Sequence, residues 1–290
     1  MKRREFLLRT ACTAGAAWLH AALPRRADAL AFKPLPRKFS ASDTITLGKT
    51  GIQTSRLAMG TGTVGVGQHS HQTALGLKGL SDLLLNGYDH GLRFFDSADS
   101  YGSHPHVAEA LKHVPRDKVT VLTKSWARDA PTMRADLDRF RRELGTDYID
   151  VFLMHCLTES NWTERFRPVM DVLSEAKEKG IIRAHGCSCH SIEALREATK
   201  SPWVEVHLVR INPIGSFMEA DPGTVVSVIK EMRAAGKGIV GMKILGQGDL
   251  RNRQDEALNF ALGLNLLDAF TIGAESKAEQ EDLLRRIAAA

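Results

Sequence analysis

An acidic side chain and a phenol stand close together near residue 100, and two further ionisable side chains end later apolar runs. The run Phe94–Phe95 ends in Asp96, and Tyr101 follows after a short turn. Later runs end in Lys124 and His155. If these runs are neighbouring parallel strands, the ionisable side chains meet at one end of a sheet. Such a group suits an acid that hands a proton to a carbonyl oxygen.

The expected roles follow from charge. A free tyrosine has a pKa of about 10, and a nearby ammonium stabilises the phenolate. We therefore expect Lys124 to lower the pKa of Tyr101, and Asp96 to hold Lys124 charged and aimed. His155 would donate to the carbonyl oxygen or polarise the tyrosine. Taken singly, these residues have structural alternatives: an ion pair at a rim, a core aromatic and a capped strand-end histidine.

The elements that must position these residues alternate along the chain. Apolar runs dense in Val, Ile and Leu are typical of strands covered on both faces. They are expected at 57–60, 92–96, 119–124, 148–155, 182–188, 204–211, 238–244 and 269–273. Amphipathic helices are expected at 73–86, 106–113, 131–144, 165–179, 192–199, 223–235, 254–262 and 277–288. Eight such units predict an α/β fold, a (β/α)8 TIM barrel preceded by a short β-hairpin at 43–60. An open doubly wound sheet is the alternative, but the glycine spacing at 60–65 lacks its acidic partner.

Several segments carry a family resemblance: 57–63, 94–102, 121–124, 144–155 and 180–183. In this order they resemble the aldo-keto reductases, most closely up to Ser188. The resemblance implies an enzyme, an NAD(P)-dependent oxidoreductase that reduces an aldehyde or ketone, and needs no metal. It implies NADPH as the cofactor, with NADH as the alternative. It also places the catalytic tetrad at Asp96, Tyr101, Lys124 and His155.

The same resemblance implies where the nicotinamide end of the cofactor lies. Gly62 and Thr63 match the loop beside the nicotinamide. Ser188 matches a carboxamide contact, but Cys189 stands where the family has asparagine. Met242 stands where many members stack a tyrosine, and a thioether also packs against a ring.

The remaining cofactor contacts are expected at the phosphates and the adenosine. Lys243 is expected to reach the pyrophosphate. The segment 272–280 resembles the adenosine-binding end, where a helix N-terminus favours a phosphate. Glu275 stands where a basic residue often meets the 2′-phosphate, and repulsion there would weaken a preference for NADP. The residues expected to bind at this end are Ser276, Lys277 and Gln280.

Loop residues supply the candidates for substrate contacts, because specificity sits in loops. We expect His71, Trp126 and Trp162 to form the substrate wall. The pair His69 and His71 also suggests an alternative, a metal-dependent amidohydrolase-like barrel with Lys124, His155 and His190. That pair lies well past its strand, and no aspartate ends the eighth strand. A second alternative is a non-catalytic nicotinamide-nucleotide-binding barrel, because Cys189 and Met242 depart from the family pattern.

Beyond residue 29 the chain has three cysteines, too few for a disulfide framework. Cys156 follows His155, and Cys187, Cys189 and His190 end the next strand. We interpret them as small buried strand residues. A thiolate–imidazole metal site and a redox pair are the alternatives.

The start of the chain resembles a twin-arginine export signal. Arg3–Arg4 precede Phe-Leu, a modestly apolar stretch and a small-x-small cleavage site near Ala29. We expect a signal at 1–29, a linker at 30–42, a barrel at 43–290 and export to the periplasm by the twin-arginine machinery. Residues 1–29 carry most of the net charge of +5, so the nearly neutral remainder gives no case for nucleic acid. The apolar stretch is too short and polar for a stable membrane anchor.

Overall fold

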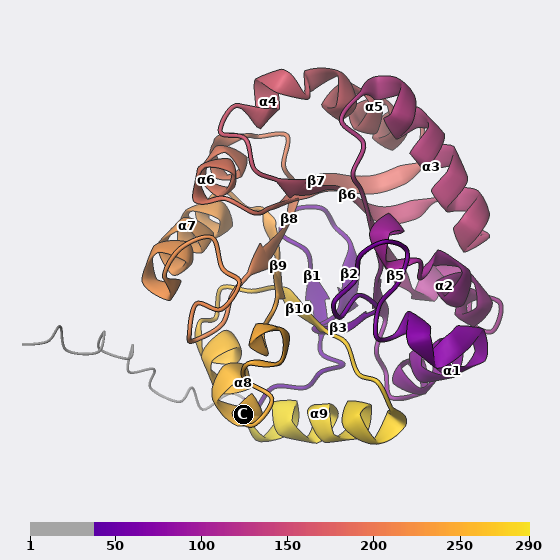
Figure 1. Ribbon diagram of the computed structural model, residues 1–290, viewed down its shortest axis with the longest axis vertical. Coiled ribbons are helices and arrows are strands. Elements are labelled where there is room, and N and C mark those ends of the chain that lie inside the picture. Colours follow the sequence, from indigo (N-terminus) through magenta and orange to yellow (C-terminus); the bar gives the residue numbers. More distant parts are fainter. Residues whose placement is uncertain (1–37) are drawn as a thin grey trace, which may run out of the picture. The chain divides into compact units, whose positions relative to one another are not determined.

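The computed structural model describes residues 38–290, and in them eight parallel strands close into a barrel (Figure 1). Neighbours in the barrel follow chain order, and the last strand pairs with the first to close it. The signal and most of the linker predicted at the start of the chain lie outside the described residues. The barrel strands are β3 (Leu57–Gly60), β4 (Phe94–Asp96), β5 (Thr120–Ser125), β6 (Ile149–Leu157), β7 (Ile182–Cys189), β8 (Val206–Arg210), β9 (Gly238–Met242) and β10 (Ala269–Ile272).

Helices surround the barrel on its outer side (Figure 1). Their beginnings are set by local chemistry, since Asp129, Ser191, Asp221 and Ser276 each accept a hydrogen bond from a backbone N–H of the first turn. None of the helices within residues 38–290 is long and apolar enough to cross a membrane. The helices are α1 (Gly76–Asp89), α2 (His104–Leu111), α3 (Ala130–Leu144), α4 (Trp162–Arg165), α5 (Arg167–Glu178), α6 (Ile192–Lys200), α7 (Pro222–Ala234), α8 (Gln254–Gly263) and α9 (Lys277–Ala289).

A two-stranded hairpin closes the end of the barrel at which the strands begin. Its strands β1 (Thr44–Thr46) and β2 (Gln53–Ser55) pair antiparallel. The connecting turn inserts Leu47 and Ile52 into the apolar cluster inside the barrel. Gly48 has a φ of +50°, and a Cβ there would lie 2.3 Å from the backbone nitrogen of Gly238, so only glycine fits. The predicted barrel with its N-terminal hairpin is confirmed.

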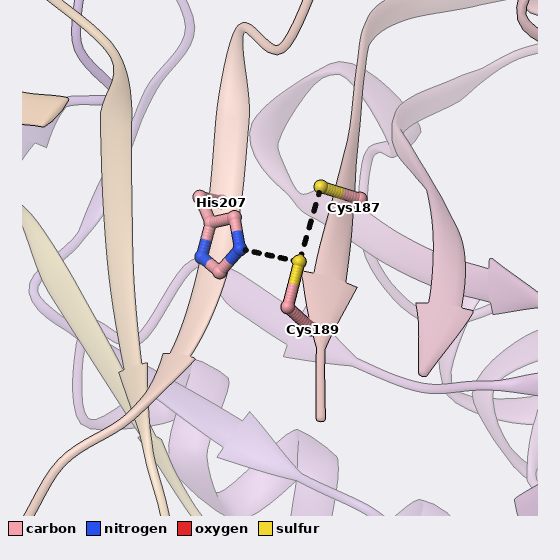
Figure 2. A group of neighbouring side chains, drawn as sticks. All are labelled: Cys187, Cys189 and His207. Atoms are coloured by element: carbon pink, nitrogen blue, oxygen red, sulfur yellow. Dashed lines mark hydrogen bonds between the residues drawn. The ribbon is translucent and has the colours of Figure 1, made fainter. Parts of the chain in front are cut away.

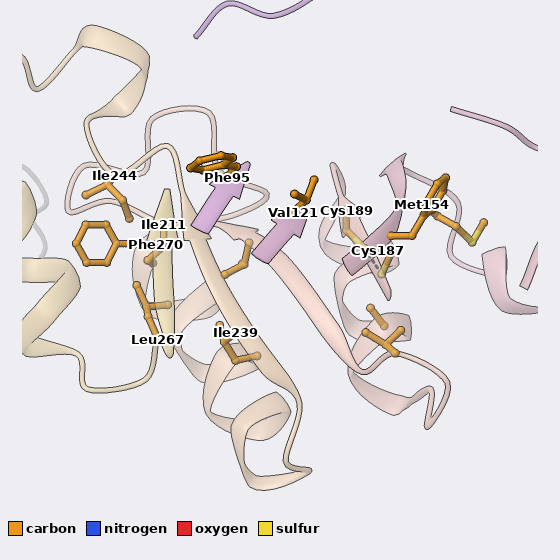
Figure 3. Close-up of a cluster of buried hydrophobic side chains, with 14 of the residues drawn as sticks. Phe95, Val121, Met154, Cys187, Cys189, Ile211, Ile239, Ile244, Leu267 and Phe270 are labelled. Atoms are coloured by element: carbon orange, nitrogen blue, oxygen red, sulfur yellow. Dashed lines mark hydrogen bonds between the residues drawn. The ribbon is translucent and has the colours of Figure 1, made fainter. Parts of the chain in front are cut away.

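The larger apolar core lies between the strands and the helices. Side chains that alternate with the inward-facing ones fill this layer, as expected for strands buried on both faces. Figure 3 shows part of it, with Phe95, Val121, Met154, Cys187 and Cys189 among its members. The hairpin closes the end of the barrel at which the strands begin. The ionisable side chains lie at the opposite end, where the strands end.

Candidate active site

Lys124 lies at the centre of the candidate site. It stands on β5 and has no exposed surface. Its Nζ donates to Asp96 Oδ1 at 2.6 Å and to the backbone oxygen of Ser97 at 2.7 Å. The same Nζ lies 3.5 Å from the hydroxyl of Tyr101 and 4.7 Å from the centre of its ring. Three of the four predicted catalytic side chains therefore form one contiguous polar group.

Asp96 and Tyr101 are positioned by the end of β4 and a 3-10 turn at Asp99–Tyr101. The second carboxylate oxygen of Asp96 accepts from Thr271 Oγ1 at 2.8 Å, so both oxygens are bonded. The ring of Tyr101 lies against the loop after β3. A Cβ would lie 2.2 Å from the ring at Gly62 and 2.3 Å at Gly65. Glycine at both positions lets this loop hold the tyrosine directly.

The pKa of Tyr101 differs from the sequence expectation. Burial of the hydroxyl is the largest influence and raises this pKa, while the ammonium of Lys124 opposes it only in part. The pKa of Tyr101 is thus raised, not lowered as expected from the neighbouring charge alone. Burial also disfavours the ammonium of Lys124, but the carboxylate of Asp96 outweighs it and the pKa of Lys124 is raised. Tyrosine is therefore the acid form and lysine the cation at neutral pH.

His155 faces the tyrosine from β6. The two ring centres lie 6.0 Å apart at nearly right angles, and the indole of Trp126 lies 5.1 Å from the imidazole. Burial, followed by the charge of Lys124, holds the pKa of His155 well below 6.5, so the imidazole is neutral near pH 7. Its Nδ1 is buried without a partner. A proton on Nε2 instead avoids burying an unpaired N–H, which leaves Nε2 as the donor.

A cleft of about 490 Å³ opens beside Tyr101 and runs to the start of α9. Its volume is within the range of about 300–1,000 Å³ typical of small-molecule and cofactor sites. Four predicted cofactor residues line it, from the loop after β3 and from β9 with the residue that follows: Gly62, Thr63, Met242 and Lys243. Lys243 donates to Gln247, and burial is the main cause that lowers its pKa.

Two other predicted cofactor residues do not reach this cleft. Ser188 is fully buried, and its hydroxyl accepts from the backbone N–H of Cys156 at 3.0 Å. Cys189 is also fully buried and points into the layer between strands and helices (Figure 3). The cysteine that replaces the family's asparagine therefore faces away from the expected nicotinamide position.

The predicted adenosine end has an acidic helix start. Ser276 caps α9 by accepting from the backbone N–H of Glu279. The Glu279 carboxylate accepts from the N–H of Glu275, the residue before the N-cap, at 2.8 Å. The Ser276 hydroxyl, expected to receive a phosphate, is therefore already bonded, and two carboxylates stand beside it. Lys277 is exposed and does not line the cleft. Gln280 is buried and bonded to Asn86, so it supports α9 rather than facing the cleft.

The sequence reasoning missed Arg251 and Gln247, which line the cleft from the loop after β9. Arg251 makes no ion pair with any carboxylate of residues 38–290, so its guanidinium is available to an anion. A signal was present in the sequence, because glycines at 246 and 248 come shortly after Lys243, and glycine is common where a loop approaches a ligand closely.

The three predicted substrate residues have different surroundings. Trp126 is 51% exposed beside His155, at the mouth of the site. His71 lines the cleft, and its Nδ1 lies 2.8 Å from Glu275 Oε1. Trp162 has no exposed surface and donates to the backbone oxygen of Ala194, so its prediction as a substrate residue is wrong. It packs in the core instead.

The histidines of the amidohydrolase alternative are not brought together. His69 is exposed, and His71 pairs with a glutamate across the cleft. Within residues 38–290, the groups of ligand-type side chains close enough to share a metal ion include neither of them, nor His155 or His190. That alternative therefore loses its geometric support.

The predicted group of three cysteines with His190 is split in two. Cys156 Sγ lies 3.2 Å from His190 Nε2, at the strand-end side of the barrel. Burial raises the pKa of Cys156 to about 11, so it is a neutral thiol. Cys187 and Cys189 lie on the outer face of β7, with His207 of β8 as their neighbour.

Comparison with known proteins places this barrel in a family. A model of the aldo/keto reductase family matches residues 56–280, and the chain belongs to that family. An NADH-specific methylglyoxal reductase of Escherichia coli is 27% identical over 63% of this chain and 65% of its own length. An NADP(+) glycerol 2-dehydrogenase of Saccharomyces cerevisiae is 30% identical over 45% of this chain and 42% of its own. The chain thus spans about two thirds or less of the length of these curated relatives.

Solved structures support the fold. A structure from Pseudomonas aeruginosa, described as a candidate aldo-keto reductase, superposes with a TM-score of 0.73. It covers 87% of this chain and 98% of its own, at 22% identity. An aldo-keto reductase of Bacillus halodurans in its holo form gives 0.68 over 84% and 90%, at 16% identity. Family membership supports an NAD(P)-dependent oxidoreductase, and these low identities add only the shared barrel.

Proposed function

We propose that the chain reduces the carbonyl group of a small aldehyde or ketone, with Tyr101 as the proton donor. The observation that carries the proposal is the buried ammonium of Lys124, held between Asp96 and the tyrosine hydroxyl at the head of the cleft. When bound, a reduced nicotinamide nucleotide supplies the hydride for the carbonyl carbon. The carbonyl oxygen takes its proton from Tyr101, which gives the alcohol and a phenolate.

The other residues support that proton transfer. The ammonium of Lys124 stabilises the phenolate. Asp96 keeps the ammonium in place with Oδ1, while its Oδ2 is held by the hydroxyl of Thr271. His155, being neutral, donates from Nε2 to the carbonyl oxygen and so orients the substrate. The raised pKa of Tyr101 keeps it protonated before the reaction, and solvent returns the proton afterwards.

We propose that the cofactor is NADH in preference to NADPH, against the first expectation from the family. Glu275 and Glu279 border the adenosine end, where their charges would repel a 2′-phosphate. Lys243 and Arg251 also line the cleft, and their positive charges suit the pyrophosphate that both nucleotides share. Titration of the purified protein with each nucleotide decides between them.

The test of the reaction is Tyr101→Phe, which keeps the ring and removes the proton. General acids of this kind contribute about 10²–10⁴-fold, so turnover of a reactive aldehyde should fall by at least about 10²-fold. Quenching of nucleotide fluorescence on binding should stay unchanged, because the cleft keeps its shape. Undiminished turnover in this variant would refute the assignment of Tyr101.

A second candidate is a barrel that binds the nucleotide without catalysis. The observation that favours it is the loss of polar groups at the expected carboxamide site, since Ser188 is buried and bonded and Cys189 faces outward. Nucleotide binding by the wild-type protein, with no turnover across a panel of aldehydes and ketones, would support this candidate against the reductase.

We further propose that the folded protein is exported through the twin-arginine machinery. The support is the arginine pair, apolar stretch and cleavage site at the start of the sequence. Cell fractionation tests this: replacing both Arg3 and Arg4 by lysine should retain the protein in the cytoplasm. Unchanged export of that variant would remove the proposal.

A further inference from the structure

A sulfur-and-imidazole cluster of Cys187, Cys189 and His207 lies on β7 and β8, on the outer face of the barrel (Figure 2). Cys187 and Cys189 are alternate residues of β7, so their side chains leave the strand on the same face. His207 stands on β8 in register with Cys187. All three side chains are fully buried in the layer between strands and helices.

The distances within the cluster suit a shared cation. The two sulfurs lie 3.9 Å apart, and Cys189 Sγ lies 3.4 Å from His207 Nε2. All three donor atoms lie within 4.8 Å of one another. A tetrahedral zinc ion with Zn–S of about 2.3 Å and Zn–N of about 2.0–2.1 Å separates its ligands by about 3.8 Å for S···S and about 3.6 Å for S···N. The Cys187–Cys189 and Cys189–His207 distances are close to these values.

A disulfide is a poorer account of the same two sulfurs. Alternate residues of an extended strand have Cα atoms about 6.6 Å apart, near the upper limit for a disulfide of about 6.8 Å. The sulfurs would have to approach from 3.9 Å to about 2.05 Å while the strand stays paired on both sides. It would also leave the contact between His207 and Cys189 unexplained.

We propose that Cys187, Cys189 and His207 bind a Zn²⁺ ion. Binding releases the two thiol protons to solvent, and no electron is transferred. The two thiolates cancel the charge of the ion, so the buried site carries no net charge. The ion joins β7 to β8 and acts as a structural brace, independently of the reductase proposal.

The test uses the full chain, untagged, expressed with zinc in the medium and purified under reducing, metal-free buffers. Elemental analysis should give about one zinc per chain. Cys187→Ala and Cys189→Ala should each reduce this at least tenfold, while Cys156→Ala, the matched control from the third cysteine, should keep it. Folding of each variant is checked by circular dichroism.

Cobalt provides a readout that needs no variant. Zinc-stripped wild-type protein titrated with Co²⁺ should show sulfur-to-metal charge transfer and the strong visible bands of a tetrahedral site. Folded wild type that takes up neither metal, or that shows a two-dalton mass loss from a disulfide at these cysteines, would overturn the proposal. Metal retained in the Cys187→Ala variant would place it elsewhere and also overturn it.

Discussion

Replacing Gly62 by alanine tests whether the loop after β3 positions the proton donor. The added Cβ would lie 2.2 Å from the nearest ring carbon of Tyr101, and its three nearest atoms all belong to that ring. An ordinary carbon–carbon contact is about 3.5 Å, so the ring must recede by about 1.3 Å. The φ of Gly62 is not in the left-handed region, so alanine fits the backbone itself.

The consequence of that shift can be estimated. The tyrosine hydroxyl is already 3.5 Å from Lys124 Nζ, so a further displacement breaks the contact that stabilises the phenolate. A misplacement of about 1 Å costs about 10²-fold in rate. We therefore expect kcat to fall about 10²-fold, equivalent to about 2.7 kcal/mol of transition-state stabilisation. Overpacking should also lower the free energy of unfolding by about 1–3 kcal/mol.

The assay is steady-state reduction of a reactive aldehyde at saturating reduced nucleotide. Gly79→Ala on α1 is the control, because its Cβ meets only the Cβ of Leu75, at 3.1 Å, far from the site. In the Tyr101→Phe background the same Gly62 change should cost little further activity, since its effect acts through the hydroxyl. A kcat within threefold of wild type in a folded Gly62→Ala protein would refute the positioning argument.

Four other outcomes are expected. Burial lowers the pKa of His155 and brings that of His190 to about 4, whereas an unfolded histidine titrates near about 6.5. The unfolded state therefore binds more protons than the folded state between about pH 4 and 6.5. Urea unfolding should show a free energy of unfolding that is constant above about pH 7 and falls as the pH drops from about 6.5 toward 4. The fall should be less steep in His190→Gln. Thr271→Val removes a hydrogen bond to a charged carboxylate and should lower the free energy of unfolding by about 1.5–3 kcal/mol in the same assay, with a loss of kcat. Glu275→Gln should tighten NADPH about threefold to fivefold in a fluorescence titration and leave NADH unchanged. Trp126→Ala should raise KM for aromatic aldehydes with little change in kcat, and an unchanged KM would remove it from the substrate wall.

The apolar runs in the sequence were enough to predict where the strands end, but not how deeply the side chains at those ends are buried. Asp96, Lys124 and His155 each end an apolar run, so the barrel topology alone brings them to one end. The direction of the Tyr101 pKa could not be predicted this way. This pKa depends on how deeply the hydroxyl is buried. That burial is produced by the loop at Gly62 and by segments distant in the sequence, which local pattern does not reveal.

For the cysteines of β7, the sequence indicated the direction of the side chains but not their contact with His207. Strand alternation separates Ser188 from Cys187 and Cys189, so the outward direction of Cys189 was readable in the sequence. Its contact with His207 was not, because that depends on the register between β7 and β8. The family resemblance placed Cys189 at the cofactor because of its position in the sequence. Its side chain instead lies on the outer face of β7, and therefore contacts His207 rather than the cleft.

An irregularity in β6 occupies Ser188, the residue that the family resemblance matches to a carboxamide contact. The pairing of β6 with β7 shifts register between Met154 and Leu157, and Cys156 has a φ of +56°, a strained value for a non-glycine residue. This conformation points the N–H of Cys156 at the Ser188 hydroxyl, 3.0 Å away. Because the hydroxyl is already occupied, contact with a carboxamide would require this bond to be given up or shared. Under the proposed function, the side of the site that donates the proton is thus complete in its contacts, while Met242 and the loop at Thr63, which line the cleft, would contact the nicotinamide.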